Sequence, residues 1–148
     1  MIILVHLLFG AAIGSLVKNV PIAIVLAFLS HYFLDLFPHI EYSVGNTEEN
    51  HWRIKLPAVL KMMLDFCLGI LLLSIFSNDR PIIFIYALSS MLPDGLTVVN
   101  YFLPNKILKV HENFHVAIHF LKYKKIPNFW RISSQVLSVM ISMLLLLR

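Results

Sequence analysis

Histidine and aspartate residues recur at every fourth position in two separate stretches of this 148-residue chain. The first series is His31, Asp35 and His39, and the second is His111, His115 and His119. On a helix, positions i, i+4 and i+8 lie about 40° apart and therefore share one face. Imidazole and carboxylate groups with this spacing can reach a common Zn²⁺ ion. The two series predict two helical faces that supply ligands to a metal centre.

Three more ionisable residues lie inside apolar stretches, where a charge is costly and is usually functional. They are His6, Asp65 and Asp94. With the two series they make nine candidate ligands, which exceeds what one tetrahedral ion needs. We therefore expect two Zn²⁺ ions, with donors enough for a third, and Mn²⁺ or Fe²⁺ as alternatives because aspartate is well represented.

The aspartates are the candidate catalytic residues. A two-metal centre suits in-line attack of an activated water on a phosphoester. In such a centre we expect Asp35 to hold or bridge the ions, and Asp65 or Asp94 to bind the second ion or to orient the water.

Four of the candidates also fit ordinary structural roles. His6 would then be a hydrogen-bonded histidine of the bundle, and Asp65 would pair with Lys61 one turn earlier. Asp94 would cap a broken helix, and His119 would lie at the membrane interface. Both interpretations stay open at these positions.

The composition indicates an integral membrane protein. The chain is 59% hydrophobic and 14% charged, with a mean hydropathy of +0.81, which excludes a disordered chain and an ordinary soluble domain. The single cysteine, Cys67, excludes an intrachain disulfide. The net charge of +4 comes from lysines and arginines that lie mostly at the ends of apolar segments, which favours lipid headgroups over nucleic acid as the partner.

Apolar runs of suitable length predict an all-α, integral membrane helical bundle that forms a single domain over residues 1–148. Spans are expected at 1–17, 20–37, 57–77 and 81–103, the last interrupted at Pro93-Asp94-Gly95, and a short fifth apolar helix at 133–147. The bundle would thus have four or five transmembrane helices. Residues 41–55 form a polar loop, and 104–122 a basic, partly amphipathic helix at or re-entering the cytoplasmic face.

Orientation follows from the positive charge near the span ends. With five spans, eight Lys and Arg residues lie on the face that holds the N-terminus, the 40–56 loop and the 104–132 segment, against three on the other face. This difference places the first face in the cytoplasm. The candidate ligands fall in the same half of the bundle, so the metal site is expected on the cytoplasmic side.

A second motif overlaps the later histidine series. His111-Glu112-Asn113-Phe114-His115 has the H-E-x-x-H pattern of zinc proteases, in which Glu112 would be the general base. This protease interpretation leaves the His31, Asp35 and His39 series without a role. A non-enzymatic metal-binding or transport protein is a third alternative, but transport favours polar residues in both halves of the membrane, and here they gather in one.

The chain resembles, at three motifs, the small bacterial and archaeal membrane-bound metal-dependent hydrolases described as LexA-regulated. The motifs are Ser30-His31-Tyr32-Phe33-Leu34-Asp35-Leu36-Phe37-Pro38-His39, Leu92-Pro93-Asp94 and the His111, His115 and His119 series. That group is similar to the zinc-dependent phospholipase C and S1/P1 nuclease superfamily, whose helices supply His-x3-Asp and His-x3-Glu pairs. His31 and Asp35 match the first pair, and His111 and His115 replace the second, with histidine for the acid.

The resemblance implies a membrane-embedded metal-dependent hydrolase of a bacterial or archaeal cell membrane. It would act on a phosphoester such as a lipid headgroup, through metal-activated water at the His/Asp cluster. Membrane lipid is the expected partner, because Lys122, Lys124 and Lys125 near the cluster favour anionic lipid or phosphate. No nucleic-acid partner is expected.

Overall fold

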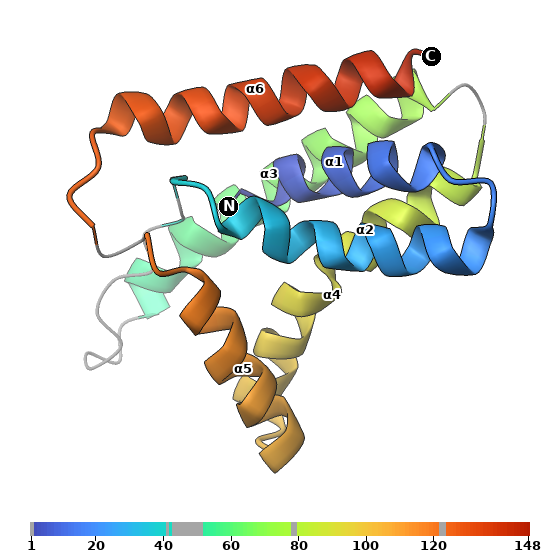
Figure 1. The fold of residues 1–148 in the computed structure, drawn as a ribbon. Helices are drawn as coiled ribbons and strands as arrows, with labels where there is room; N and C mark the ends of the chain where they lie inside the picture. Colours follow the sequence, from blue (N-terminus) through green and yellow to red (C-terminus); the bar gives the residue numbers. More distant parts are fainter. Residues whose placement is uncertain (1, 41, 43–51, 78–79, 122–123) are drawn as a thin grey trace.

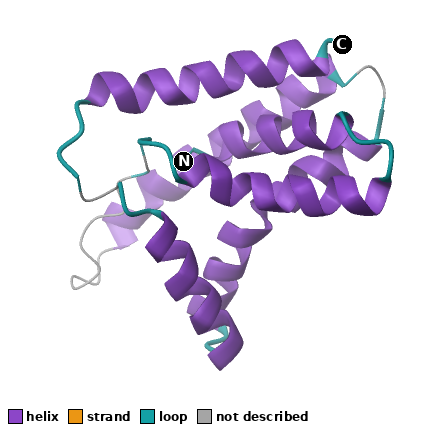
Figure 2. Ribbon diagram, viewed as in Figure 1, coloured by secondary structure: helices purple, strands orange, loops and turns teal. Residues whose placement is uncertain are grey.

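The computed structural model describes residues 2–40, 42, 52–77, 80–121 and 124–148. Within these ranges the chain is all-α, as predicted, and forms six helices (Figures 1 and 2). They are α1 (Ile3–Ser15), α2 (Val20–Asp35), α3 (Trp52–Phe76), α4 (Ile82–Phe102), α5 (Lys106–Ile118) and α6 (Asn128–Leu146). Most of the predicted polar loop at 41–55, and Lys122, lie outside the described residues.

Helix α1 lies at the centre of the bundle, where it contacts α2, α3, α4 and α6. Its sequence is apolar on every side, which is typical of a helix that is buried all round. Val5, Leu7, Leu8 and Ala11 are accordingly fully buried. The central position of α1 brings its one ionisable residue, His6, into the interior.

Two glycines let α1 and α4 approach closely. A Cβ atom added at Gly10 would lie 2.3 Å from the Cβ of Ser90, and one added at Gly14 would lie 2.3 Å from the Cγ of Tyr86. Gly10 and Gly14 have the spacing of small residues that brings membrane helices together. The contact sets the His6 turn of α1 beside the middle of α4, where the Ser90 hydroxyl donates a hydrogen bond to the His6 carbonyl at 2.7 Å.

Helix α2 begins at a capped end and stops before a proline. The Asn19 side chain accepts a hydrogen bond from the Ile22 amide at 3.1 Å, and Pro21 lies in the first turn, where its missing N–H is harmless. Pro38 disfavours helical backbone in the residue before it, and α2 ends at Asp35. In Figure 1 this end of α2 lies at the same end of the bundle as the start of α1, which places Asp35, the last residue of α2, there.

Helix α4 continues through Pro93, contrary to the predicted interruption at Pro93-Asp94-Gly95. Proline has no N–H and its ring crowds the carbonyl one turn earlier, so the helix bends there instead of ending. In Figure 1 the first half of α4 passes behind α2, and the second half turns away and packs beside α5. The two helices form a hairpin that projects from the bundle.

Helix α6 is longer than predicted, since it begins at Asn128 rather than near residue 133. Pro127 precedes its first turn, and Arg131 is accommodated there by hydrogen bonds to backbone carbonyls. At 19 residues α6 is long and apolar enough to cross a membrane, as are 59–76 of α3 and 82–100 of α4. Helices α1 and α2 are apolar but have only 13 and 16 residues. At 1.5 Å per residue they are about 20 and 24 Å long, against about 30 Å of hydrocarbon.

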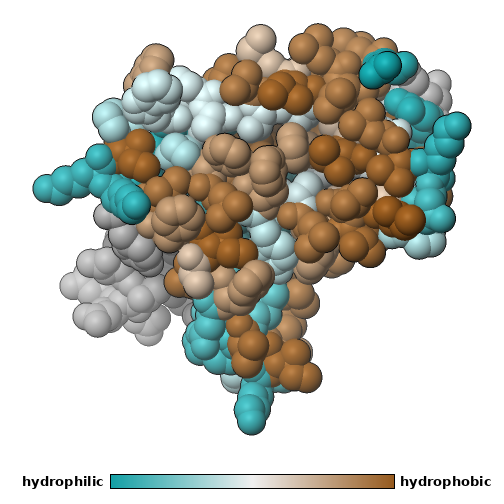
Figure 3. Space-filling view, in the orientation of Figure 1, coloured by the Kyte–Doolittle hydropathy of each residue, from teal (hydrophilic) through white to brown (hydrophobic). Residues whose placement is uncertain are grey.

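The outer surface of the bundle is apolar. Figure 3 shows apolar side chains over α2 and the right-hand part of α6, with hydrophilic residues at both ends of the bundle and on the α4–α5 hairpin. Phe33 on α2 is 51% exposed, and Leu64 and Ile75 on α3 are 70% and 62% exposed. Exposed apolar surface of this extent is what contact with lipid requires.

The predicted amphipathic helix at 104–122 corresponds to α5. It begins after Asn105, whose side chain accepts a hydrogen bond from the Ile107 amide at 2.8 Å. Ile107 and Val110 on one face are 77% and 63% exposed, while His115 on the other face is buried. The helix thus directs part of the second histidine series towards α2.

Candidate metal centre

Asp35 lies at the centre of the candidate metal site. The residue is 1% exposed, and both carboxylate oxygens face histidine Nε2 atoms. Oδ2 is 3.0 Å from His31, 3.2 Å from His115 and 3.2 Å from His119, and Oδ1 is 3.3 Å from His6 and 4.0 Å from His39. Five of the predicted ligands therefore surround one buried carboxylate.

Five of the six separations among four donor atoms are close to those of a tetrahedral zinc site. Bonds to Zn²⁺ of about 2.0–2.1 Å place neighbouring ligand atoms roughly 3.3–3.4 Å apart. Five of the separations among His31 Nε2, His115 Nε2, Asp35 Oδ2 and Asp94 Oδ1 are 3.0, 3.1, 3.2, 3.6 and 3.7 Å. The donors come from α2, α4 and α5, and Asp94 directly follows the proline at which α4 bends.

A second group of donors shares Asp35 with the first. Asp35, His39 and His119 offer ligand atoms that all lie within 4.8 Å of one another. His6, His31 and Asp94 meet the same distance and form a third group. Because Asp35 and His31 each belong to more than one donor set, the donors form one continuous centre rather than separate sites.

Hydrogen bonds at the outer ring nitrogens determine which nitrogen faces the centre. His31 Nδ1 is 2.8 Å from the Ser90 carbonyl, and His39 Nδ1 is 2.7 Å from the Phe37 carbonyl. A carbonyl only accepts, so Nδ1 donates its proton and the neutral ring presents an unprotonated Nε2 to the centre. The lone pair of His31 Nε2 then faces the Asp35 carboxylate at 3.0 Å. A cation between them stabilises this arrangement, so the donor set fits a metal ion.

His6 adds a second indication that the cluster is built around a cation. Its ring is 1% exposed and stacks on His31 with centroids 4.0 Å apart. Neither ring nitrogen makes a hydrogen bond within the described part of the chain, although Nε2 lies 3.3 Å from Asp35 Oδ1. A buried polar group left in this way costs about 1–3 kcal/mol. Metal coordination through Nε2 would remove that penalty.

The structure places Asp65 outside the cluster. Its Oδ2 accepts a hydrogen bond from the Leu4 amide at 2.8 Å and another from the Tyr42 hydroxyl. Burial and the hydrogen bond to Asp65 raise the pKa of Tyr42, which keeps the phenol protonated as the donor. Asp65 thus binds the amino end of α1, where backbone N–H groups lack helical partners. It is in none of the described three-residue donor groups.

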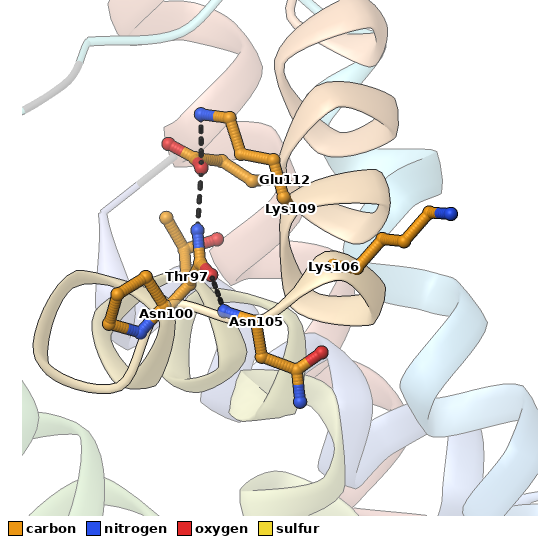
Figure 4. A pocket seen from close by; sticks show the side chains of 7 residues that line it. Thr97, Asn100, Asn105, Lys106, Lys109 and Glu112 are labelled. Atoms are coloured by element: carbon orange, nitrogen blue, oxygen red, sulfur yellow. Dashed lines mark hydrogen bonds and ion pairs between the residues drawn. The ribbon is translucent and has the colours of Figure 1, made fainter.

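The two sides of the H-E-x-x-H motif face different surroundings. His111 Nε2 lies 2.9 Å from the Tyr32 hydroxyl, at the border of the centre. Glu112 instead accepts hydrogen bonds from Lys109 at 2.9 Å and Asn100 at 2.8 Å, in a pocket between α4 and α5 (Figure 4). The Lys109 ammonium lowers the pKa of the Glu112 carboxyl. Neither residue belongs to a described donor group.

Two polar residues of α4 contact the histidines and were not predicted as part of the site. The Ser90 carbonyl binds His31, and the Thr97 hydroxyl lies 3.2 Å from His115 Nδ1. With Asp94 they occupy positions i, i+4 and i+7, which share one face of a helix. This polar stripe in an otherwise apolar segment is the sequence signal that would have identified Thr97, whereas the Ser90 carbonyl is a backbone group and gives no such signal.

Comparison with protein-family models gives no match, and comparison with curated proteins and with solved structures gives no significant match. The character of the chain therefore rests on its own residues. Three of its helices are long and apolar enough to cross a membrane. A buried cluster of His and Asp residues is able to hold metal ions.

Proposed function

We propose that the chain is a membrane-embedded, metal-dependent hydrolase that acts on a phosphoester of the lipid-headgroup type. The observation that carries the proposal is the arrangement around Asp35. Five of the six separations among the donors of His31, His115, Asp35 and Asp94 are 3.0–3.7 Å, and Asp35 also belongs to the group with His39 and His119. A carboxylate shared between two donor groups is suited to bridging a pair of ions.

The two groups suggest different roles for the two ions. Four protein donors close a zinc site, whereas three leave a position for water, as in catalytic sites. The open group is that of Asp35, His39 and His119. Zn²⁺ bound there would lower the pKa of a coordinated water to about 7 and polarise the phosphoryl oxygen. The imidazole-rich donors favour Zn²⁺, and the aspartates also suit Mn²⁺ or Fe²⁺.

The chain's own residues divide the remaining work. Asp35, which is buried, holds the donors of both groups together. The Asp94 side chain is 40% exposed, so it can bind an ion and also contact an incoming phosphoester or its water. Lys124 and Lys125, both exposed, add positive charge beyond α5 that attracts an anionic headgroup. Asp65 is left out of the catalytic set because it binds the amino end of α1.

The same proposal includes a topology of four or five spans, with the metal centre on the cytoplasmic side. It is supported by the eight-to-three distribution of Lys and Arg. Cys67 would be replaced by serine, and a new cysteine placed at Lys125 in intact cells. We expect labelling of this cysteine only after the membrane is permeabilised. Labelling of this cysteine from outside intact cells would show that the proposed orientation is wrong.

The test of function combines metal loading with turnover. Protein purified in detergent and loaded with Zn²⁺ is assayed on phospholipid in mixed micelles and on a soluble phosphodiester, before and after chelation. We expect metal-dependent hydrolysis, with the lipid preferred. Asp94→Asn should lower kcat by about 100-fold or more, whereas the matched variant Asp65→Asn should not. Metal-loaded protein that hydrolyses neither substrate would contradict the proposal.

One variant separates this proposal from a zinc protease. Glu112→Gln should leave phosphoester hydrolysis within about twofold, because the side chain binds Lys109 and Asn100 rather than the donor cluster. In a protease of the H-E-x-x-H type the same variant would remove the general base. Loss of activity on Glu112→Gln with an unaltered metal content would favour the protease.

A further inference from the structure

Three consecutive carbonyls that follow α2 are bound by side chains of α6. The Ser134 hydroxyl donates to the Pro38 carbonyl, Arg131 Nη1 to the His39 carbonyl at 3.0 Å, and Gln135 Nε2 to the Ile40 carbonyl at 2.8 Å. Residues 131, 134 and 135 lie at i, i+3 and i+4, on one face of a helix. The backbone around the His39 donor is therefore held by α6.

Arg131 also binds the segment that follows α5. Its Nη2 donates to the Lys124 carbonyl at 3.2 Å, and its Nε donates to the Ile126 carbonyl at 3.4 Å. This segment begins shortly after His119, the C-cap residue of α5. One guanidinium thus joins the backbone that carries His39 to the backbone that leads away from His119.

We infer that Arg131 is a positioning residue that sets His39 and His119 against Asp35 and so assembles the three-donor group. The inference rests on the proposed function, because it assigns a role within the same metal centre. It concerns only one of the two groups. His31, Asp94 and His115, the partners of Asp35 in the four-donor group, come from α2, α4 and α5, whereas the carbonyls that Arg131 binds belong to the segments after α2 and α5. The two groups adjoin at His115, whose Nε2 lies 3.2 Å from His119 Nε2.

The geometry requires arginine in particular. A guanidinium presents five N–H donors in a rigid plane, so it can bind three separate carbonyls at once. Lysine keeps the charge but offers a single ammonium on a flexible stem, which cannot span the same carbonyls. Arg131→Lys therefore removes the bridge between the two segments while retaining the positive charge.

The experiment measures metal content rather than activity alone. Wild type, Arg131→Lys and Arg131→Gln are titrated with Co²⁺ in detergent, and binding is followed by visible absorption and equilibrium dialysis. We expect wild type to bind two ions, and both variants to bind one ion normally and the other about 10- to 100-fold more weakly, as for outer-shell changes at metal sites. His39→Ala should reproduce this pattern.

Arg80→Lys is the matched control. Arg80 also donates to backbone carbonyls, of Ser77 at 3.1 Å and of Leu146 at 3.5 Å, at the opposite end of α6 from Arg131. The Arg80→Lys variant should bind both ions with wild-type affinity. Two ions bound with wild-type affinity by Arg131→Lys, or equal weakening of both ions, would overturn the inference while leaving the hydrolase proposal in place. A wild-type protein that binds no metal would instead refute the proposed function.

Discussion

Replacement of Asp35 by asparagine should weaken both metal sites at once. Asparagine has nearly the same size, but it is neutral and can offer only its single carbonyl oxygen as a ligand. Both carboxylate oxygens of Asp35 face imidazoles, with Oδ2 3.0 Å from His31 and Oδ1 3.3 Å from His6. Asp35 is also the residue shared by the groups that contain His115 and His119. No other single substitution should affect both ions to this extent.

The expected loss can be estimated from the number of ligands. Four-ligand structural zinc sites bind with apparent free energies of about 10–16 kcal/mol, or about 2.5–4 kcal/mol per ligand if the ligands contribute equally. Removal of one ligand then raises the Kd for the ion by about 100- to 1,000-fold. The metal-free variant should still fold, because the asparagine amide can donate hydrogen bonds to the unprotonated histidine nitrogens.

Equilibrium dialysis with Zn²⁺ in detergent, at fixed pH, measures the result. Asp65→Asn is the control, since it makes the same chemical change at a residue that binds the amino end of α1. It should retain two ions with wild-type affinity. Thermal unfolding of both metal-free variants verifies that they are folded. If Asp35→Asn weakened only one ion, or if Asp65→Asn weakened binding equally, the assignment of Asp35 as the shared ligand would be wrong.

Four further outcomes follow from the packing and the donor chemistry. Thr97→Val removes the partner of His115 Nδ1 and should weaken the four-donor site by about 10- to 100-fold in a Co²⁺ titration; unchanged affinity would deny Thr97 a role. Gly10→Ala places a Cβ 2.3 Å from that of Ser90, so it should destabilise the protein by about 1–3 kcal/mol. Nothing in the described part of the chain lies within 4 Å of a Cβ added at Gly95, so Gly95→Ala should be neutral or stabilising when the two glycine variants are compared by thermal unfolding. Acidification from pH 7 to about pH 5 should release the ions, because metal competes with protons for neutral imidazoles, and pH-independent retention in dialysis would exclude histidine ligation.

Helix periodicity predicts which members of each series share a helical face, but it does not predict that the two faces meet. The predicted helical position of His39 is wrong, because α2 ends at Asp35 and the segment after the helix places His39 beside it. His31 and Asp35 share a face whatever the tertiary structure, and so do His115 and His119. Periodicity alone would also place His111 on this face, one turn before His115. In the structure His111 instead meets the Tyr32 hydroxyl and belongs to none of the described donor groups.

Other parts of the site depended on tertiary contacts that no spacing reveals. Asp65 was predicted as a ligand because it is an acid in an apolar helix, but the nearby amino end of α1 takes its hydrogen-bonding capacity. Arg131 lay outside the helix predicted at 133–147. Its partners are backbone carbonyls, which leave no mark in the sequence, and they allow α6 to begin earlier than hydropathy indicated.

The central claim is that Asp35 is shared by two metal ions, and anomalous X-ray diffraction at the zinc edge tests it most directly. Crystals of the zinc-loaded protein should show one peak enclosed by His31, Asp94, His115 and Asp35, and a second between Asp35, His39 and His119. A map in which bound zinc lies elsewhere, for example beside Glu112, or in which no peak contacts Asp35, would contradict the account.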